Sequence, residues 1–359
     1  MNPKDYLELA RKTSVINWDD EEQRKIAPLG LLGELGSLAT IVKRSIRDSF
    51  ASSRYESHMI EELADLLWYI TIIADSRDVF LDSWPMAERP SQRFEQLILL
   101  ESKVASLLAL VADHSVVMPD EINDVIGRVF QELANTADVV NLTLAGVAEA
   151  SAKKITAHWL PDKSKPAKYF DADYPLYEQL PRKFRVDFRE IVHEAEDKPN
   201  ELIISMNGMH LGDRLTDNNH QVDGYRYHDV FHLAGACCLG WSPVFRSMLK
   251  RKRKSDSEID RVQDGARAII LEEAIVGEIF TFLRGSDFPD GINRVDSDLI
   301  KLIQALVEGY EADSLEPWEW QDYIIKAFKL FRQIRHGFSG SIVFDAERRE
   351  MTIVDSTFQ

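Results

Sequence analysis

Two short segments place acidic side chains within apolar helical patterns. Glu34 lies in the first segment, and Glu62 and Asp65 lie in the second, which continues as the apolar run LADLLWYITIIA. Because Glu62 and Asp65 are three residues apart, a helix would project both from one face. Burying an ionised carboxylate is costly unless a cation or hydrogen-bond donors compensate its charge. We therefore expect these three residues to be metal ligands, for Mg²⁺ in the first place and Mn²⁺ as an alternative, since both ions accept carboxylate oxygens.

These segments resemble the MazG-like all-α nucleoside triphosphate pyrophosphohydrolases. The family's pattern is an acidic pair on one helix followed by Glu-x-x-Asp on the next. GELG at 33–36 is similar to the first motif and ELADLLWY at 62–69 to the second, and DYLELA at 5–10 is similar to the family's first helix. Ser37 stands where the family usually carries a second glutamate, and the neighbouring Glu61 is a candidate to compensate for it.

The resemblance implies hydrolysis of a nucleoside triphosphate substrate between its α and β phosphates, giving a nucleoside or deoxynucleoside monophosphate and pyrophosphate. Glu34, Glu62 and Asp65 would hold the metal ion, which neutralises phosphate oxygens and lowers the pKa of the attacking water. Glu61 and Glu62 are the candidate catalytic carboxylates, one of which would accept the proton of that water. A non-catalytic nucleotide sensor that signals through the C-terminal domain is the alternative from another functional class, and Ser37 is its main support.

Two further residues are candidates for binding the nucleotide. ASAKKI at 150–155 resembles the closing helix of MazG-like proteins, in which a lysine reaches the substrate phosphates. Lys154 is the closer match, and Ser151 stands in place of the family's preceding asparagine. A solvated lysine pair near a helix end is the alternative for this segment. Trp18 could stack on a base, although tryptophans in helical bundles are more often core residues.

A second group of chemistry-bearing residues lies in the C-terminal half. His228 and His232 are four residues apart, so a helix would aim both imidazoles to one side. Glu272 or Glu273 could complete a His/carboxylate metal site or orient a ring nitrogen. With Asp229, the segment superficially resembles the His-Asp pair of HD phosphohydrolases, so a phosphohydrolase centre is one interpretation. A core histidine pair that is hydrogen-bonded to Asp229 and Glu273 is the other.

The order of these patterns predicts a mainly α protein of two domains. Residues 1–160 are almost entirely helical in pattern, residues 161–180 are rich in proline and are expected to be a linker, and residues 181–359 combine helices with strands. We expect an all-α helical bundle followed by a smaller α+β domain, which resembles the C-terminal domain attached to some MazG-like proteins. Its antiparallel sheet should use strands at 182–191, 201–210, 341–345 and 350–354.

The helical region contains a candidate internal repeat. LLESKVASL around Glu101 echoes the Glu34 helix, and QELAN at 131–135 echoes EELAD. An alternative register sets Asp138 opposite Asp65, as a second buried carboxylate. Such a repeat would form a pseudo-dimer within one chain, and a homo-oligomer is the other way to pair helical hairpins.

Composition limits the classes of partner. The chain has 359 residues and a net charge of −17, which disfavours binding of nucleic acid over the whole surface. The run KRKRK at 250–254 could bind phosphates or nucleic acid, but we interpret it as a solvated helix end. Cys237 and Cys238, the two cysteines, are adjacent and provide no disulfide framework. No signal-peptide pattern and no apolar run of about 18 residues are evident, so we expect a cytoplasmic protein without a membrane partner.

Overall fold

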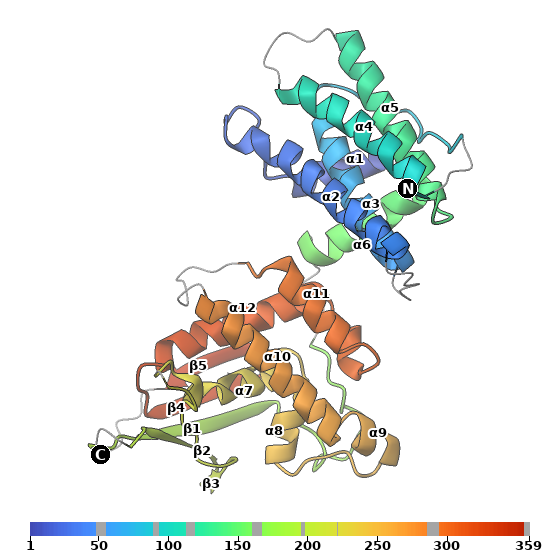
Figure 1. The fold of residues 1–359 in the computed structure, drawn as a ribbon. Coiled ribbons are helices and arrows are strands. Elements are labelled where there is room, and N and C mark those ends of the chain that lie inside the picture. The colour runs from blue at the N-terminus through green and yellow to red at the C-terminus, as the bar shows by residue number, and fades with distance from the viewer. Residues whose placement is uncertain are drawn as a thin grey trace. The chain divides into compact units, whose positions relative to one another are not determined.

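The chain folds into two compact units, Met1–Pro161 and Asp162–Gln359, each with its own hydrophobic core (Figure 1). The structure is a computed structural model. It describes residues 1–47, 55–88, 93–112, 119–159, 167–194, 198–220, 222–285 and 294–354. A mainly α fold with an antiparallel sheet in the C-terminal part is confirmed.

The described part of the N-terminal unit is helical. A short 3-10 helix, Gln23–Lys25, precedes the second of its α-helices, which are α1 (Pro3–Thr13), α2 (Ile26–Arg47), α3 (Tyr55–Asp75), α4 (Arg93–Ala112), α5 (Pro119–Asp138) and α6 (Leu144–Trp159).

Two helical hairpins form the body of this unit. Helix α2 packs against α3, and α4 packs against α5. The hairpins also meet through corresponding helices, since α2 contacts α4 and α3 contacts α5. Their apolar faces share one core, to which α2, α3, α4 and α5 contribute Leu31, Leu63, Leu100 and Leu133 respectively. This pairing is the arrangement that an internal repeat would produce. Helices α1 and α6 both pack against α3.

Helix α2 departs from one expectation. With the turn before it, Gln23–Arg47 is long and apolar enough to cross a membrane by length and composition alone, so the chain does contain such a run. This test is weak evidence, because core helices of soluble bundles pass it as well. In the structure, Leu31, Leu35 and Leu38 are buried in the bundle core.

The C-terminal unit is built on a five-stranded antiparallel sheet of order β3-β2-β1-β4-β5. Its strands are β1 (Lys183–Ile191), β2 (Glu201–Met206), β3 (Met209–His210), β4 (Gly340–Asp345) and β5 (Glu350–Val354). Side chains alternate along β1, so that Phe184, Val186 and Phe188 face the core. The segment 201–210 is two strands rather than the single strand expected. Asn207 and Gly208 both have positive φ, 53° and 76°, and form the tight turn between β2 and β3.

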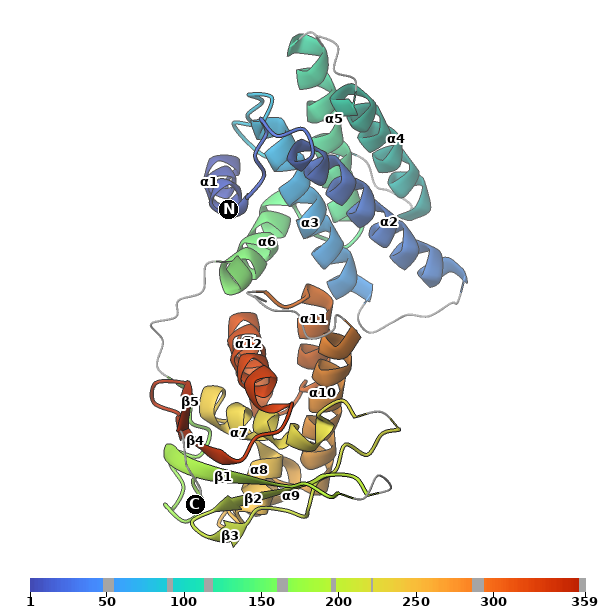
Figure 2. The ribbon, with the colours of Figure 1, turned by 90° about the vertical axis from the view of Figure 1, so that its left-hand side faces the viewer.

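Helices cover one side of this sheet, where α7, α10 and α12 lie (Figure 2). Every residue of α7 is buried, and it contacts β4, β5, α8, α10 and α12. The helices are α7 (Asp229–Cys238), α8 (Pro243–Met248), α9 (Ser257–Val262), α10 (Ala266–Gly285), α11 (Ser297–Leu306) and α12 (Pro317–Ile334), with 3-10 helices at Tyr225–Tyr227 and Glu311–Ser314.

The expected linker is in part integrated into the C-terminal unit. Residues 160–166 lie outside the described part of the chain. Farther along, Asp171 is fully buried and accepts hydrogen bonds from the Leu180 amide and the Arg246 guanidinium, both at 2.7 Å, and from Arg182 at 2.5 Å. These contacts attach the segment around Asp171 to the α+β fold.

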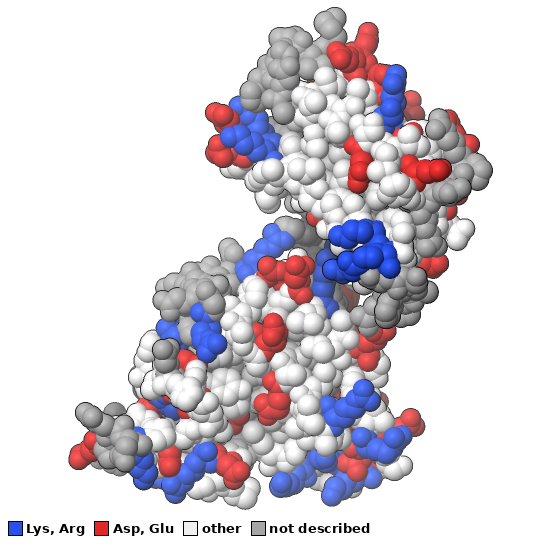
Figure 3. Space-filling view, in the orientation of Figure 1, with Lys and Arg blue, Asp and Glu red and all other residues white. Residues whose placement is uncertain are grey.

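The basic run 250–254 is only partly solvated, which corrects its interpretation. Arg253 is 1% exposed and is paired with Asp264 and Glu311 at 2.7 and 2.8 Å, so it is a core ion-pair residue. Lys250 and Lys254 remain exposed. On the face shown in Figure 3, basic side chains occur in small groups among acidic ones.

Candidate functional site

Helices α2 and α3 bring the predicted acidic residues together. Glu34 comes from α2, and Glu61, Glu62 and Asp65 come from the middle of α3, all half-buried. Burial, and next a hydrogen bond that the protonated Glu62 donates to Glu34, raise the pKa of Glu62 to about 8, with further contributions from the charges of Glu34, Asp65 and Glu61. The raised pKa therefore reflects the burial of Glu62 first and the nearby carboxylates second. The arrangement supplies oxygen ligands only, which is the donor set that Mg²⁺ prefers.

Lys154 of α6 reaches the same group of carboxylates. Its Nζ atom lies 2.7 Å from Asp65 Oδ1, 2.5 Å from Asp65 Oδ2 and 3.6 Å from Glu61 Oε1. The structure therefore places this lysine at the acidic site, and the adjacent Lys153 is exposed. In this position Lys154 can compensate part of the negative charge, and its ammonium is available to an anionic ligand that approaches the carboxylates.

Trp18 and Ser37, two further residues singled out in the N-terminal half, differ in their burial. Trp18 is partly buried against the N-terminal core, the structural role that the sequence left as its alternative. The side chain of Ser37 is exposed one turn beyond Glu34 on α2. The acidic group therefore consists of Glu34, Glu61, Glu62 and Asp65. Position 37 adds no carboxylate to it.

Supporting residues that the sequence analysis missed surround the carboxylates. Tyr69 lies one turn after Asp65, and its pKa is raised by burial and by the charges of Glu34 and Asp65. Its ring crosses α2 at Gly30, where an added Cβ would lie 2.6 Å from the tyrosine hydroxyl oxygen. The apolar sequence after Asp65 contained this tyrosine, but only the packing of α2 on α3 shows what it contacts.

A buried hydrogen-bond chain fixes α6 beside α3. The hydroxyl groups of Tyr6 and Ser151 are 2.8 Å apart, and Ser151 Oγ donates to the Ala64 carbonyl oxygen at 3.3 Å. Ser151 precedes Lys154 by one helical turn, so this chain positions the lysine. The residue that stands in place of the family's asparagine thus has a structural role in this protein.

The second hairpin contains a counterpart of the acidic site in which side-chain amides hydrogen-bond to a single carboxylate. Gln96 of α4 donates from Nε2 to Glu132 Oε2 at 2.8 Å, and Asn135 Nδ2 donates to the same oxygen at 3.1 Å. Glu132 and Asn135 occupy the positions of Glu62 and Asp65 in the repeat register of QELAN and EELAD. Asp138 is exposed, so the alternative register with a buried carboxylate at that residue is wrong.

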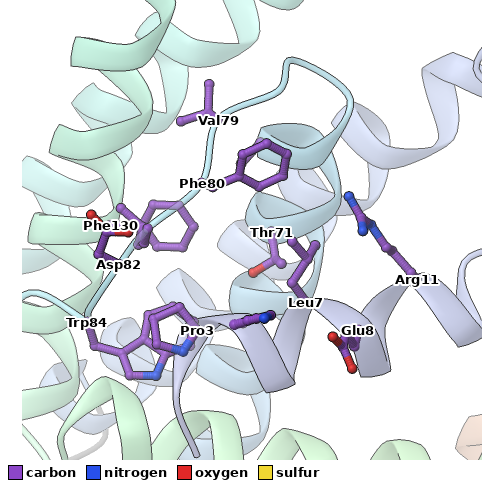
Figure 4. A pocket seen from close by; sticks show the side chains of 13 residues that line it. Pro3, Leu7, Glu8, Arg11, Thr71, Val79, Phe80, Asp82, Trp84 and Phe130 are labelled. Carbon is purple, nitrogen blue, oxygen red and sulfur yellow. The ribbon is translucent and has the colours of Figure 1, made fainter.

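A cavity of about 430 Å³ opens farther along α3 (Figure 4). It lies between α1, the end of α3, Phe130 of α5 and the segment from Val79 to Trp84. Arg11 at its edge is already bound to Asp75, with Nε 3.0 Å from Oδ2. Its lining residues do not include the four carboxylates of the acidic site.

The histidine cluster is assembled by α7 and α10. His232 Nδ1 lies 2.8 Å from Glu272 Oε1, and Glu272 also accepts hydrogen bonds from the Ser242 hydroxyl and the Val244 amide, both at 2.7 Å. His232 Nε2 is 3.4 Å from Glu273 Oε2 and has no hydrogen-bond partner. Burial lowers the pKa of His232, but Glu272 and Glu273 outweigh it and raise the pKa to about 10.

His228 completes this cluster at the start of α7. Its Nδ1 donates to the Tyr225 carbonyl oxygen at 2.9 Å, and its Nε2 lies 3.3 Å from Asp229 Oδ1. The Tyr225 ring stacks on the imidazole at 4.3 Å between centroids. Burial lowers the pKa of His228. The histidines are thus anchored through Nδ1 by Glu272 and a carbonyl oxygen, and the carboxylates of Glu273 and Asp229 lie beside their Nε2 atoms.

A sequence model of the MazG C-terminal domain matches residues 165–357. The match covers more than half of the chain and contains the whole histidine cluster, whereas the acidic site lies outside it. Comparison with curated proteins and with solved structures found no match.

Proposed function

Since this chain belongs to the MazG C-terminal domain family, we propose that its N-terminal unit is a Mg²⁺-dependent nucleoside triphosphate pyrophosphohydrolase. The products would be a nucleoside or deoxynucleoside monophosphate and pyrophosphate. One observation carries the proposal: four carboxylates from α2 and α3 lie together, and the ammonium group of Lys154 contacts two of them, Asp65 and Glu61. Oxygen ligands for a hard cation, placed beside a group that binds anions, suit the polyphosphate chain of a nucleotide.

The residues would divide the work as follows. Glu34, Glu62 and Asp65 hold Mg²⁺, which supplies charge neutralisation at phosphate oxygens and a water of lowered pKa. Glu62 would release to solvent the proton that it shares with Glu34, because a bound cation would offset both the burial and the neighbouring carboxylates that raise its pKa. Glu61 accepts the proton of the attacking water, and Lys154 turns from Asp65 to a phosphate oxygen of the substrate.

Exchanging Asp65 for asparagine tests the proposal. Asp65→Asn should abolish Mg²⁺-dependent pyrophosphate release, because it removes a charged metal ligand and the ion-pair partner of Lys154. The matched control is Asp138→Asn, which makes the same change at an exposed position of the second hairpin. Pyrophosphate is measured with a panel of nucleoside and deoxynucleoside triphosphates. Unchanged turnover by Asp65→Asn would refute the assignment.

The same panel tests the second candidate, a non-catalytic nucleotide sensor. The exposed Ser37 favours it, since a pyrophosphohydrolase of the resembled family usually has a glutamate there. Saturable nucleotide binding by the unmodified chain, with no pyrophosphate released from any member of the panel, would support the sensor. Release of pyrophosphate from any one nucleotide would exclude it.

A further inference from the structure

We propose that His228, Asp229, His232 and Glu273 form a binding site for a divalent transition-metal ion, with Zn²⁺ the best-matched ion. The site lies entirely within the C-terminal unit and is independent of the pyrophosphohydrolase activity proposed above. His228, Asp229 and His232 each offer a ligand atom, and these atoms lie within 4.8 Å of one another.

Both imidazoles are oriented as metal ligands are. A histidine that binds a metal usually donates its other ring N–H to a carboxylate or a backbone carbonyl oxygen. His232 meets the carboxylate of Glu272 through Nδ1, and His228 meets the Tyr225 carbonyl oxygen through Nδ1. The two Nε2 atoms are therefore the ones left for a ligand, and each faces a carboxylate, of Glu273 and of Asp229 respectively.

The separation within each pair of donor atoms fits two ligands of one ion. With metal–ligand bonds of about 2.0–2.1 Å, two ligand atoms of a tetrahedral Zn²⁺ site lie about 3.4 Å apart. His232 Nε2 and Glu273 Oε2 are separated by 3.4 Å, and His228 Nε2 and Asp229 Oδ1 by 3.3 Å. Both separations match this value and are longer than a normal charge-assisted hydrogen bond of about 2.7–2.9 Å.

The burial of His232 Nε2, with only the Glu273 carboxylate beside it at 3.4 Å, adds to the argument. His232 is 0% exposed, and its Nε2 has no hydrogen-bond partner. A buried polar atom without a partner is costly and calls for an explanation, of which an ion is one. Glu272 strengthens this argument, because the Ser242 hydroxyl and the Val244 amide hold its carboxylate against the opposite ring nitrogen. The cluster therefore fixes His232 firmly while leaving Nε2 for a ligand.

The donor set indicates the class of ion. Two imidazoles with carboxylates favour Zn²⁺ and related first-row ions over Mg²⁺, which prefers oxygen ligands. The side chain of Glu273 is 43% exposed, whereas those of His228 and Asp229 are 11% and 7% exposed. An ion can therefore enter beside Glu273, and the histidines lie on the buried side of the site.

Zinc binding by the full chain tests this proposal. We would use a chain carrying Glu62→Gln, which weakens the acidic site, and titrate it with Zn²⁺ against a chromophoric chelator. One Zn²⁺ should bind per chain, and Mg²⁺ should not displace it. Glu273→Gln should weaken Zn²⁺ binding by about tenfold or more, a loss seen even for residues that only orient a metal ligand. Glu278→Gln, at an exposed position of α10, should leave binding unchanged.

A spectroscopic measurement identifies the atoms directly. In a chain with ¹⁵N-labelled histidine, Zn²⁺ should shift the Nε2 resonances of His228 and His232 and leave exposed His210 unaffected. In the His228→Gln variant, the shift that Zn²⁺ causes in the Nε2 resonance of His232 should be reduced or abolished. If the folded chain binds no Zn²⁺, or if Glu273→Gln and His228→Gln bind it as tightly as the Glu278→Gln control, the cluster is a structural histidine pair and the proposal is wrong.

Discussion

Glu62 lies against Glu34 where α2 meets α3, and burial together with this contact raises its pKa from 4.5 to about 8. Between these two pH values the metal-free native state holds a proton that the unfolded chain has released. Stability rises with pH only where the unfolded state binds more protons. The sign here is the opposite, so Glu62 makes the metal-free protein less stable as the pH increases from about 4.5 to about 8.

Glu62→Gln should remove this contribution, because glutamine carries no titrating proton. In the presence of a chelator, the midpoint of thermal unfolding of the unmodified chain should fall more steeply with pH than that of Glu62→Gln. In a second measurement above pH 8, added Mg²⁺ should raise the midpoint of thermal unfolding of the unmodified chain more than that of Glu62→Gln. Glu56→Gln, at an exposed position of α3, is the control and should keep the slope of the unmodified chain. Identical slopes for both variants would contradict the shared proton between Glu34 and Glu62.

Lys154 tests how the site holds the substrate. Lys154→Gln should raise the KM for the nucleotide by about tenfold or more, since a hydrogen bond to a charged group contributes about 1.5–3 kcal/mol. The effect on kcat should be smaller, because the carboxylates remain in place. Lys153→Gln is the matched control, as the adjacent lysine is exposed. Steady-state kinetics of pyrophosphate release would decide, and equal KM values for the two variants would exclude contact between Lys154 and the substrate.

At the level of helical elements, the hairpin α2/α3 carries a group of carboxylates, and the hairpin α4/α5 carries amides hydrogen-bonded to one carboxylate at the corresponding place. In the second hairpin, Gln96 and Asn135 supply amide donors to Glu132, so this buried carboxylate is satisfied without a cation. Asn135 also accepts a hydrogen bond from the Glu88 amide at 2.9 Å. The network is thus a structural brace between α4 and α5.

Asn135→Asp should destabilise this brace. The exchange removes the Nδ2 donor to Glu132 and sets a second carboxylate beside the first in a position that is 1% exposed. We expect the free energy of unfolding to fall by about 1–3 kcal/mol, the cost of leaving a buried polar group unsatisfied. Urea denaturation measures the change. Asn123→Asp repeats the exchange at an exposed position of α5 and should have little effect. Equal stability of the two variants would show that Asn135 does not stabilise Glu132.

Sequence spacing predicted relations within one element better than contacts between elements. The three-residue spacing placed Glu62 and Asp65 on one face of α3, and the alternation of side chains located β1, β4 and β5. The repeat register was less accessible, because Leu-rich and Ala-rich helices align in several ways. The register that set Asp138 opposite Asp65 failed, since Asp138 is exposed. Gln96, which belongs to no motif, is the partner of Glu132. Tyr69 against Gly30 could likewise be recognised only once α2 and α3 were packed together.

At the level of the whole molecule, the two candidate sites belong to units with separate cores. Glu34, Glu61, Glu62, Asp65 and Lys154 all lie in Met1–Pro161, and the histidine cluster lies in Asp162–Gln359. The N-terminal core is assembled from α2 to α6 and α1, and the C-terminal core from the sheet and its helices. A unit with its own hydrophobic core can in principle fold alone.

A fragment of residues 1–161 should therefore release pyrophosphate from the same nucleotides as the full chain, with a kcat within a few-fold of it. Circular dichroism establishes first that the fragment is helical and unfolds cooperatively. The fragment 162–359 should bind Zn²⁺ and release no pyrophosphate, which separates the two sites chemically. If the folded 1–161 fragment is inactive while the full chain turns over, the C-terminal unit supplies a group that the reaction needs. If fragment 162–359 alone hydrolyses the nucleotide, the histidine cluster is the catalytic centre and the bundle is its scaffold.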